Sequence, residues 1–275
     1  MIKILKYGEV ENNAIFARTN EKANVEKTVS EIIENVKRNG DKALFEYCEM
    51  FDKAKLSSFA VSAEEMENAV KSVDERFISV LKKAAANIRK FHEKQVRTSF
   101  IINDESGIVT GQKILPVDCA GLYVPGGTAA YPSTVLMDAI PAKIAGVKNL
   151  VMVTPPRPDG SVNPVILAAA SIAGIDKIFK IGGAQAIAAL AYGTESIPKA
   201  DKIVGPGNAY VAEAKKQVFG LVSIDMVAGP SEILIVADET VNPKYAAADL
   251  LSQAEHDKLA SAVLVTTSVK VAEEV

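Results

Sequence analysis

The sequence predicts an α/β fold in which a helical N-terminal segment precedes parallel β-sheets covered by helices. Two observations indicate this fold. Before Gly107 the chain contains successive amphipathic helical patterns rich in lysine and glutamate. After Gly107 the charge decreases, glycine, proline and β-branched residues increase, and short apolar strands alternate with helices. Such alternation is typical of a parallel sheet with helices on its faces.

The composition narrows the class of protein. The chain has 275 residues, 48% hydrophobic and 24% charged, which fits one large or two ordinary folded domains. Its 31 basic and 34 acidic residues nearly cancel, so no general affinity for nucleic acid or membranes is expected. No apolar run reaches the roughly 18 to 20 residues of a membrane span. The two cysteines, Cys48 and Cys119, match no C-x-x-C pattern, which favours a reducing cytoplasm.

Four helices are predicted before Gly107. The first covers residues 25–38, which carry apolar residues at helical spacing and end at Asn39-Gly40, and a second covers residues 41–50. Ser62 and Glu65 form a capping-box pattern that begins a third helix. The fourth, residues 74–96, is expected to turn its apolar positions inward. These positions are Phe77, Val80, Leu81, Ala84, Ile88 and Phe91.

The second part of the chain alternates strands and helices. Strands are predicted at 108–117, 121–124, 149–154, 177–181, 202–204, 233–237 and 262–267. Helices are predicted at 133–145, 162–173, 184–192, 209–219 and 244–256. Ser268 is a good cap for a further helix, which ends with the chain after about two turns. We therefore expect either a frayed end or the front part of a longer protein, with one face of the strand at 262–267 left bare.

Four predicted strands are followed by loops rich in glycine and proline. They are residues 123–127, 182–185, 205–208 and 228–232. Glycine lets a ligand approach the backbone, and the helix N-termini that follow offer free N–H groups to phosphate. Four such loops at one sheet edge favour a nucleotide-sized ligand, although tight turns alone would also explain them. No G-x-G-x-x-G follows a strand, so the usual dinucleotide fingerprint is absent.

Single polar residues give weaker signals. Gln185 and Asn208 lie where predicted helices begin, and Asn208 also fits a plain helix cap. Gln253 and His256 are three residues apart and share a helix face, where an amide oxygen and an imidazole are able to bind a metal. For such a pair taken alone, a solvated helix end with a chance histidine is the favoured interpretation. Catalytic zinc needs three protein ligands, whereas this chain offers two at most.

Several sequence blocks, taken together, resemble histidinol dehydrogenases. The blocks are residues 121–127, 182–191, 204–208, 224–237 and 248–256. Their order and spacing agree with that family, and the resemblance extends over essentially the whole chain. It implies NAD- and zinc-dependent oxidation of L-histidinol, through the aldehyde, to L-histidine at the end of histidine biosynthesis. The implied site residues are Tyr123, Gln185 and Asn208 for NAD, and Ser231, Gln253 and His256 for the substrate, with Gln253 and His256 also holding zinc.

The resemblance also implies an architecture. The family has an aldehyde-dehydrogenase-like α/β fold with two incomplete Rossmann-type domains and forms an intertwined homodimer. Residues 1–118 are expected to join residues 237–275 in one domain, and residues 119–236 to form the second. The family's catalytic glutamate–histidine pair and its remaining zinc ligands lie beyond residue 275, so no catalytic residue is assigned. The chain is therefore expected to be truncated and inactive by itself.

Two alternatives remain at the level of the sequence. One is a paralogue on the same scaffold that oxidises another small alcohol. The other is a non-catalytic fragment that binds a nucleotide without turnover. Ser231, Gln253 and His256 favour histidinol over another alcohol, because all three match the positions at which the family binds its substrate.

Overall fold

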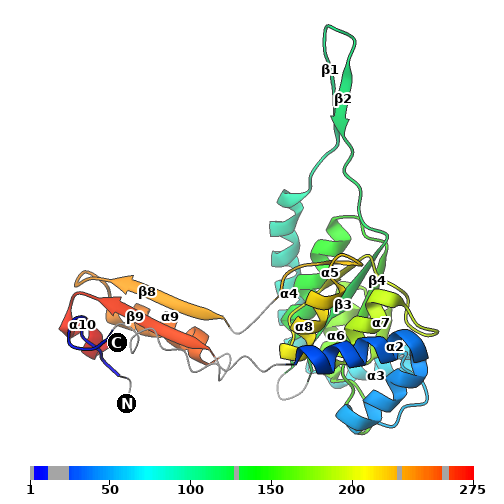
Figure 1. The fold of residues 1–275 in the computed structure, drawn as a ribbon, viewed down its shortest axis with the longest axis horizontal. Coiled ribbons are helices and arrows are strands. Elements are labelled where there is room, and N and C mark those ends of the chain that lie inside the picture. The colour runs from blue at the N-terminus through cyan, green and yellow to red at the C-terminus, as the bar shows by residue number, and fades with distance from the viewer. Residues whose placement is uncertain (1–2, 12–24, 127–129, 228–230, 256–259) are drawn as a thin grey trace. The chain divides into compact units, whose positions relative to one another are not determined.

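The protein consists of two compact units of α/β type. The computed structural model describes residues 3–11, 25–126, 130–227, 231–255 and 260–275 (Figure 1). One unit comprises Asn24–Ala228, and the other combines Met1–Ala23 with Gly229–Val275. The α/β class and the parallel sheets predicted from the sequence are confirmed. Among the described residues, none of the helices is long and apolar enough to cross a membrane.

The larger unit is built on five parallel strands. They are β3 (Cys119–Tyr123), β4 (Asn149–Thr154), β5 (Lys177–Lys180), β6 (Lys202–Val204) and β7 (Ser223–Ile224). Their order in the sheet is β5-β4-β3-β6-β7, and every neighbouring pair is parallel. The chain therefore adds β4 and β5 on one side of β3 and then adds β6 and β7 on the other side.

Helices cover both faces of this sheet. They include α5 (Pro132–Ile144), α6 (Pro164–Ala173), α7 (Gly183–Tyr192) and α8 (Ala209–Val218). In β4, Leu150 and Met152 join the core with α5 and α6, whereas Val151 and Val153 join the core with α7 and α8. Successive strand residues thus enter opposite cores, as the period of two requires. Because both faces are buried, the strands appear in the sequence as unbroken apolar runs.

The first helix is longer than predicted. α2 (Glu26–Tyr47) continues through the expected stop at Asn39-Gly40, where Gly40 adopts a non-helical conformation with φ of 50°. The Glu195 carboxylate accepts a hydrogen bond from the Asp41 N–H at 2.8 Å and so holds the kink. The helix passes into the π-helical turn η1 (Cys48–Asp52). Asn39-Gly40 therefore does interrupt the helix, as predicted, but the interruption is a kink within α2 and not its end.

The N-terminal helices of the larger unit pack on the helices that cover its sheet. α2 packs against α7 and α8, while α3 (Ala63–Ser72) and α4 (Glu75–His92) pack against α5 and α6. The grouping expected from the sequence, residues 1–118 with 237–275 and residues 119–236 separately, therefore differs from the compact units. The physical reason is burial, because the apolar stripe of α2 is buried in one core with residues of α7 and α8.

The inward face of α4 is narrower than predicted. Leu81 is buried, and Ala84 and Ile88 pack at the edge of the same core. Phe77, Val80 and Phe91 are instead 37%, 55% and 65% exposed, so their predicted burial is wrong within the described chain. The three exposed residues follow the helical period of the buried ones, which is why the sequence pattern could not separate them.

A β-hairpin extends from the larger unit (Figure 1). It pairs β1 (Phe100–Asn103) with β2 (Val109–Gln112) in antiparallel register, and all eight strand residues are exposed. Only β2 lies within the strand predicted at 108–117. β1 falls in a stretch for which no strand was predicted, since its residues follow a charged helix end.

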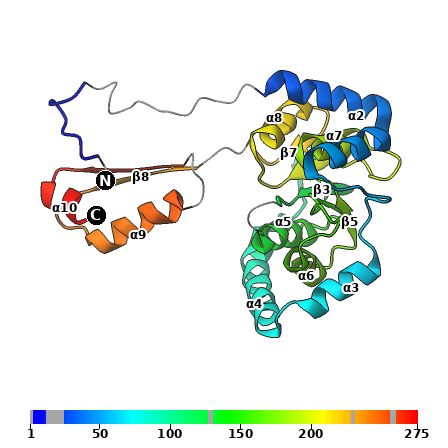
Figure 2. The ribbon, with the colours of Figure 1, turned by 90° about the horizontal axis from the view of Figure 1, so that it is seen from below.

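The smaller unit contains a strand–helix–strand motif (Figure 2). β8 (Glu232–Ala237) and β9 (Ser261–Thr266) are parallel, and α9 (Pro243–Ala254) packs against both. On the face that α9 does not cover, Leu234, Val236 and Val265 are 63%, 75% and 50% exposed. The predicted bare face is thus confirmed among the described residues. α10 (Val269–Glu274) begins at Ser268, whose hydroxyl caps it as predicted.

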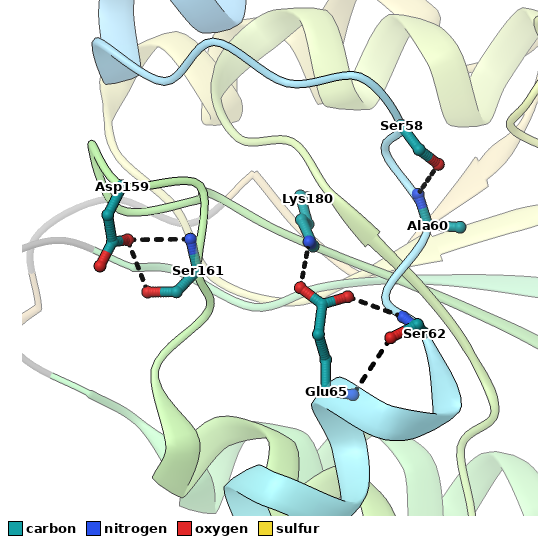
Figure 3. A network of polar contacts seen from close by, with 7 residues as sticks. All are labelled: Ser58, Ala60, Ser62, Glu65, Asp159, Ser161 and Lys180. Carbon is teal, nitrogen blue, oxygen red and sulfur yellow. Dashed lines mark hydrogen bonds and ion pairs between the residues drawn. The ribbon is translucent and has the colours of Figure 1, made fainter.

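The predicted capping box connects α3 to the sheet (Figure 3). The Ser62 hydroxyl accepts a hydrogen bond from the Glu65 N–H at 3.1 Å, and the Glu65 carboxylate accepts one from the Ser62 N–H at 2.8 Å. The other carboxylate oxygen pairs with the ammonium group of Lys180, which is 8% exposed at the end of β5. One glutamate therefore starts a helix and neutralises a buried lysine.

We expect Glu65→Ala to lower the free energy of unfolding by about 2 kcal/mol, because it removes a cap and leaves Lys180 unpaired. Glu64→Ala, an exposed neighbour in the same turn, is the control and should have little effect. Burial alone would raise the pKa of Glu65, but hydrogen bonds from Lys180 and Ser62 outweigh it and lower that pKa. This stabilisation is present above the unfolded-state pKa and is lost as the pH falls through the folded-state pKa.

Urea unfolding of both variants at neutral and acid pH measures the effect. The deficit of Glu65→Ala should shrink in acid. A deficit that is the same at both pH values would show that the ion pair contributes nothing.

Candidate functional site

The carboxyl ends of the parallel strands form one edge where several predicted loops meet. Strand order reverses between β3 and β6, and ligands of open α/β sheets bind in the crevice beyond such a switch point. Gly205, directly after β6, has a φ of +116°, a conformation that favours glycine. A Cβ atom there would collide with the carbonyl oxygen of Tyr123, the last residue of β3. The two loops are therefore as close as their backbones allow.

The loops after β4 and β5 join the same edge. Pro155, which follows β4, lies against both Gly126 and Gly182, since a Cβ on either glycine would come within 2.6 Å of the proline ring. The Gly183 N–H donates a hydrogen bond to the Tyr123 hydroxyl oxygen at 3.1 Å. Three of the four predicted glycine-rich loops are thus brought together. Of the fourth, at 228–232, residues 228–230 lie outside the described part of the chain.

Tyr123 connects two of these loops. Its side chain is 4% exposed, and burial raises the pKa of its hydroxyl to about 12, so the phenol stays protonated at neutral pH. The hydroxyl oxygen accepts from the first residue of α7. Tyr123 therefore fixes the entrance of that helix, and its predicted contact with NAD stays a prediction.

Gln185 is a buried polar residue in the first turn of α7. It is 2% exposed, and its side-chain oxygen lies 2.6 Å from the position that a Cβ on Gly183 would take. The N-cap of α7 is Gly182, which has no side chain, so Gln185 does not serve as the cap. The Gln185 amide lies beside Gly183 at the N-terminus of α7. An amide in this position can hold the loop in place or donate a hydrogen bond to a ligand bound at the helix start.

Asn208 caps α8, as the simpler interpretation predicted. Its side-chain oxygen accepts hydrogen bonds from the N–H groups of Tyr210 and Val211, each at 3.1 Å. The oxygen is used in the cap, and no described hydrogen bond uses the Nδ2 group, which stays available as a donor. The side chain is exposed beside Gly205 and Gly207. Capping and ligand binding are therefore compatible at this residue.

Three charged residues at this edge were missed by the sequence analysis. Lys215 is 1% exposed, pairs with the Asp225 carboxylate and donates to the Gly205 carbonyl oxygen at 2.9 Å. Asp225 also accepts from the Gly205 N–H at 2.8 Å. Asp138 has a buried carboxylate oxygen with no hydrogen-bond partner among the described residues. The sequence could have indicated Asp138, because it is the single charged residue in the first, apolar part of α5. Lys215, in contrast, lies in an ordinary charged run.

The thiols give no sign of nucleophilic chemistry. Burial, followed by the nearby Asp52 carboxylate, raises the pKa of Cys48 to about 12. Burial also raises the pKa of Cys119. Reactive cysteines have lowered pKa values, so both thiols act as small apolar core residues.

The predicted substrate residues lie in the smaller unit. Ser231 is exposed directly before β8, and Gln253 is half-buried in the last turn of α9. His256 lies outside the described residues. No group of three or more histidine, cysteine, aspartate or glutamate side chains that could hold a metal occurs in the described ranges. The residues described here therefore do not make up a zinc site by themselves.

The fold and the loop edge define the class of protein. A five-stranded parallel sheet in this order, with glycine-rich loops at its switch point, is a Rossmann-type α/β domain. The family model described as histidinol dehydrogenase matches residues 16–275. The chain belongs to the histidinol dehydrogenase family, which confirms the resemblance seen in the sequence blocks.

Individual relatives agree with this assignment. The chain is 57% identical over 273 residues to a histidinol dehydrogenase of Clostridium acetobutylicum, covering 98% of this chain and 63% of the relative. It is 55% identical over 272 residues to one of Listeria monocytogenes, covering 99% of this chain and 62% of that protein. A crystal structure of histidinol dehydrogenase from Elizabethkingia anophelis matches with a TM-score of 0.88 and 45% identity, over 94% of this chain and 60% of that one. The chain thus spans about three fifths of the length of these relatives.

We expect Tyr123→Phe to destabilise the larger unit by about 1 to 3 kcal/mol, because it leaves the N–H of Gly183 without its acceptor. Tyr192→Phe is a matched control, since the described residues give no hydrogen bond for its hydroxyl. Amide hydrogen exchange locates the effect. Exchange should quicken at Gly183 and the first turn of α7 in Tyr123→Phe. Unchanged exchange there would show that this hydrogen bond does not hold the loop.

Proposed function

We propose that the whole protein oxidises L-histidinol, through the aldehyde, to L-histidine with NAD as the oxidant. The observation that carries this proposal is the close packing of glycine-containing loops beyond the switch point between β3 and β6, in a chain of this family. Ligands of open α/β sheets, dinucleotides among them, bind beyond such a switch point.

The residues at the crevice fit a dinucleotide. The N-termini of α7 and α8 both lie at this edge, and helix N-termini attract phosphate through the helix dipole. The side-chain amides of Gln185 and Asn208 supply neutral hydrogen-bonding groups beside them. NAD, when bound, supplies the hydride acceptor. The residues of the chain hold the loops in place. Tyr123 does so by accepting a hydrogen bond from the Gly183 N–H.

The substrate and zinc positions are proposed on the resemblance of the sequence blocks. Ser231, Gln253 and His256 are assigned to L-histidinol, and Gln253 and His256 also to zinc. The described residues alone do not form a metal site, so no step of the reaction is derived through the metal. The structure supports the assignment of Gln253 in one respect, because this residue lies in the last turn of α9.

In the whole protein, we expect Gln253→Ala and His256→Ala each to lower zinc occupancy and the rate of NADH formation from L-histidinol together, by about tenfold or more. Ser252→Ala is the control, because this residue is an exposed neighbour on α9 whose hydroxyl donates to the Asp249 carbonyl oxygen. Metal analysis and initial rates measure the two effects. Full zinc occupancy with full activity in His256→Ala would remove the metal assignment. Turnover of another alcohol but not of L-histidinol would contradict the proposed function.

We further propose that the protein is a homodimer and that a second copy covers the hairpin β1–β2. The hairpin presents Phe100, Ile101, Ile102 and Val109 at exposed fractions of 50%, 75%, 55% and 67%. An apolar hairpin of this kind promotes association, and burial of one such side chain contributes roughly 1.5–3 kcal/mol.

We expect Ile101→Lys to shift the whole protein from dimer toward monomer, because a lysine cannot be buried there without a partner. Gln112→Lys, on the neighbouring strand of the same hairpin, adds the same charge without removing an apolar side chain. Sedimentation velocity over a dilution series distinguishes the two variants. A dimer of unchanged affinity in Ile101→Lys would show that the hairpin is not the contact.

A further inference from the structure

Gly205 is held from both sides by a charged cluster, which we call the Gly205 clamp and which consists of Asp138, Lys215, Asp225 and Gly205. The Lys215 ammonium group donates to the Gly205 carbonyl oxygen at 2.9 Å, and the Asp225 carboxylate accepts from the Gly205 N–H at 2.8 Å. Lys215 and Asp225 also pair with each other. The backbone of one glycine is therefore fixed by a lysine from α8 and an aspartate after β7.

Asp138 reaches the same glycine from α5. Its Oδ2 atom lies 3.1 Å from the position that a Cβ on Gly205 would take. That oxygen is buried and has no hydrogen-bond partner among the described residues. The clamp therefore holds two carboxyl groups and one ammonium group, and the ammonium group already bonds to Asp225 and Gly205.

The surroundings of Asp138 make its charge costly. Burial is the main cause that raises its pKa to about 7, the Asp225 carboxylate raises it further, and Lys215 offsets part of this. α4, α6 and β3 pack on α5, but among their described residues no charged group contributes to the shift. Asp225 and Lys215 are thus the charged groups that Asp138 meets.

We propose that Asp138 is a positioning residue whose protonation state sets how firmly the clamp holds Gly205 and the Asn208 loop. When Asp138 is neutral, the ammonium group of Lys215 is balanced by Asp225 alone and keeps its bond to Gly205. When Asp138 is ionised, a second carboxylate competes for Lys215 and weakens its hold on the loop. The negative charge also lies beneath a loop that, in the proposed function, faces a pyrophosphate.

Two consequences follow, of which only the second rests on the proposed function. First, the backbone of Gly205 should change its environment as the pH rises through about 7. Second, NAD should bind more weakly above that pH than below it. Bound NAD would raise the pKa of Asp138, because its phosphates are negative. For each pKa unit of that rise, the affinity for NAD falls by at most about tenfold between low and high pH.

Nuclear magnetic resonance of the 275-residue chain tests the first consequence without any ligand. The amide resonance of Gly205 should titrate with a midpoint near 7 and stay flat in Asp138→Asn, which keeps the shape and removes the charge. Asp176→Asn, an exposed aspartate of the same unit, is the control and should titrate like the unaltered chain. A Gly205 amide that does not titrate in the unaltered chain overturns the proposal, whether or not Asp138→Asn folds.

Calorimetric titration with NAD at pH values on either side of about 7 tests the second consequence. We expect weaker binding at the higher pH in the unaltered chain and equal binding at both pH values in Asp138→Asn. If the whole protein does not bind NAD but Gly205 titrates through Asp138, the positioning role stands and the proposed function fails. If NAD binds equally at both pH values and Gly205 does not titrate, the positioning role fails and the proposed function stands.

Discussion

The close approach of two loop backbones at the switch point of the sheet is the constraint on which the rest of the site depends. Gly205 comes so near to the Tyr123 carbonyl that no other residue fits, and its φ of +116° is suited to glycine alone. The same tyrosine holds Gly183 through its hydroxyl. Loops after three strands are thereby fixed relative to one another before any ligand arrives. Such preorganisation reduces the entropy lost on binding.

The sheet was the most predictable part of the chain. Short apolar runs such as 149–154, bounded by polar and proline residues, predict buried strands because both faces of a parallel sheet are covered. The glycine-rich loops were also recognisable in the sequence. One or two such loops after strands are common as tight turns, whereas four in one chain favour a ligand-binding edge. Gln185 and Asn208 could be located at helix starts. What the sequence could not reveal was that Asn208 uses its oxygen in the cap and keeps its amide group for other partners.

Long-range charge pairing was not predictable. Lys215 and Asp225 are ten residues apart, yet they meet because β6, α8 and β7 bring both to Gly205. A lysine in the run Ala212–Gln217 gives no hint of being 1% exposed. The placement of the N-terminal helices failed for a related reason. Helical spacing shows which face of α2 is apolar, but not that α7 and α8 cover it. These relations depend on topology rather than on any local pattern.

We propose that the dinucleotide binds at the loop edge beyond β3 and β6. Mapping the amide resonances of the 275-residue chain while NAD is added tests this proposal. We expect the largest shifts at Gly183, Gly205 and Asn208, with Tyr192, at the far end of α7, unaffected. Shifts confined to residues away from these loops, or binding that leaves all three amides unchanged, would contradict it.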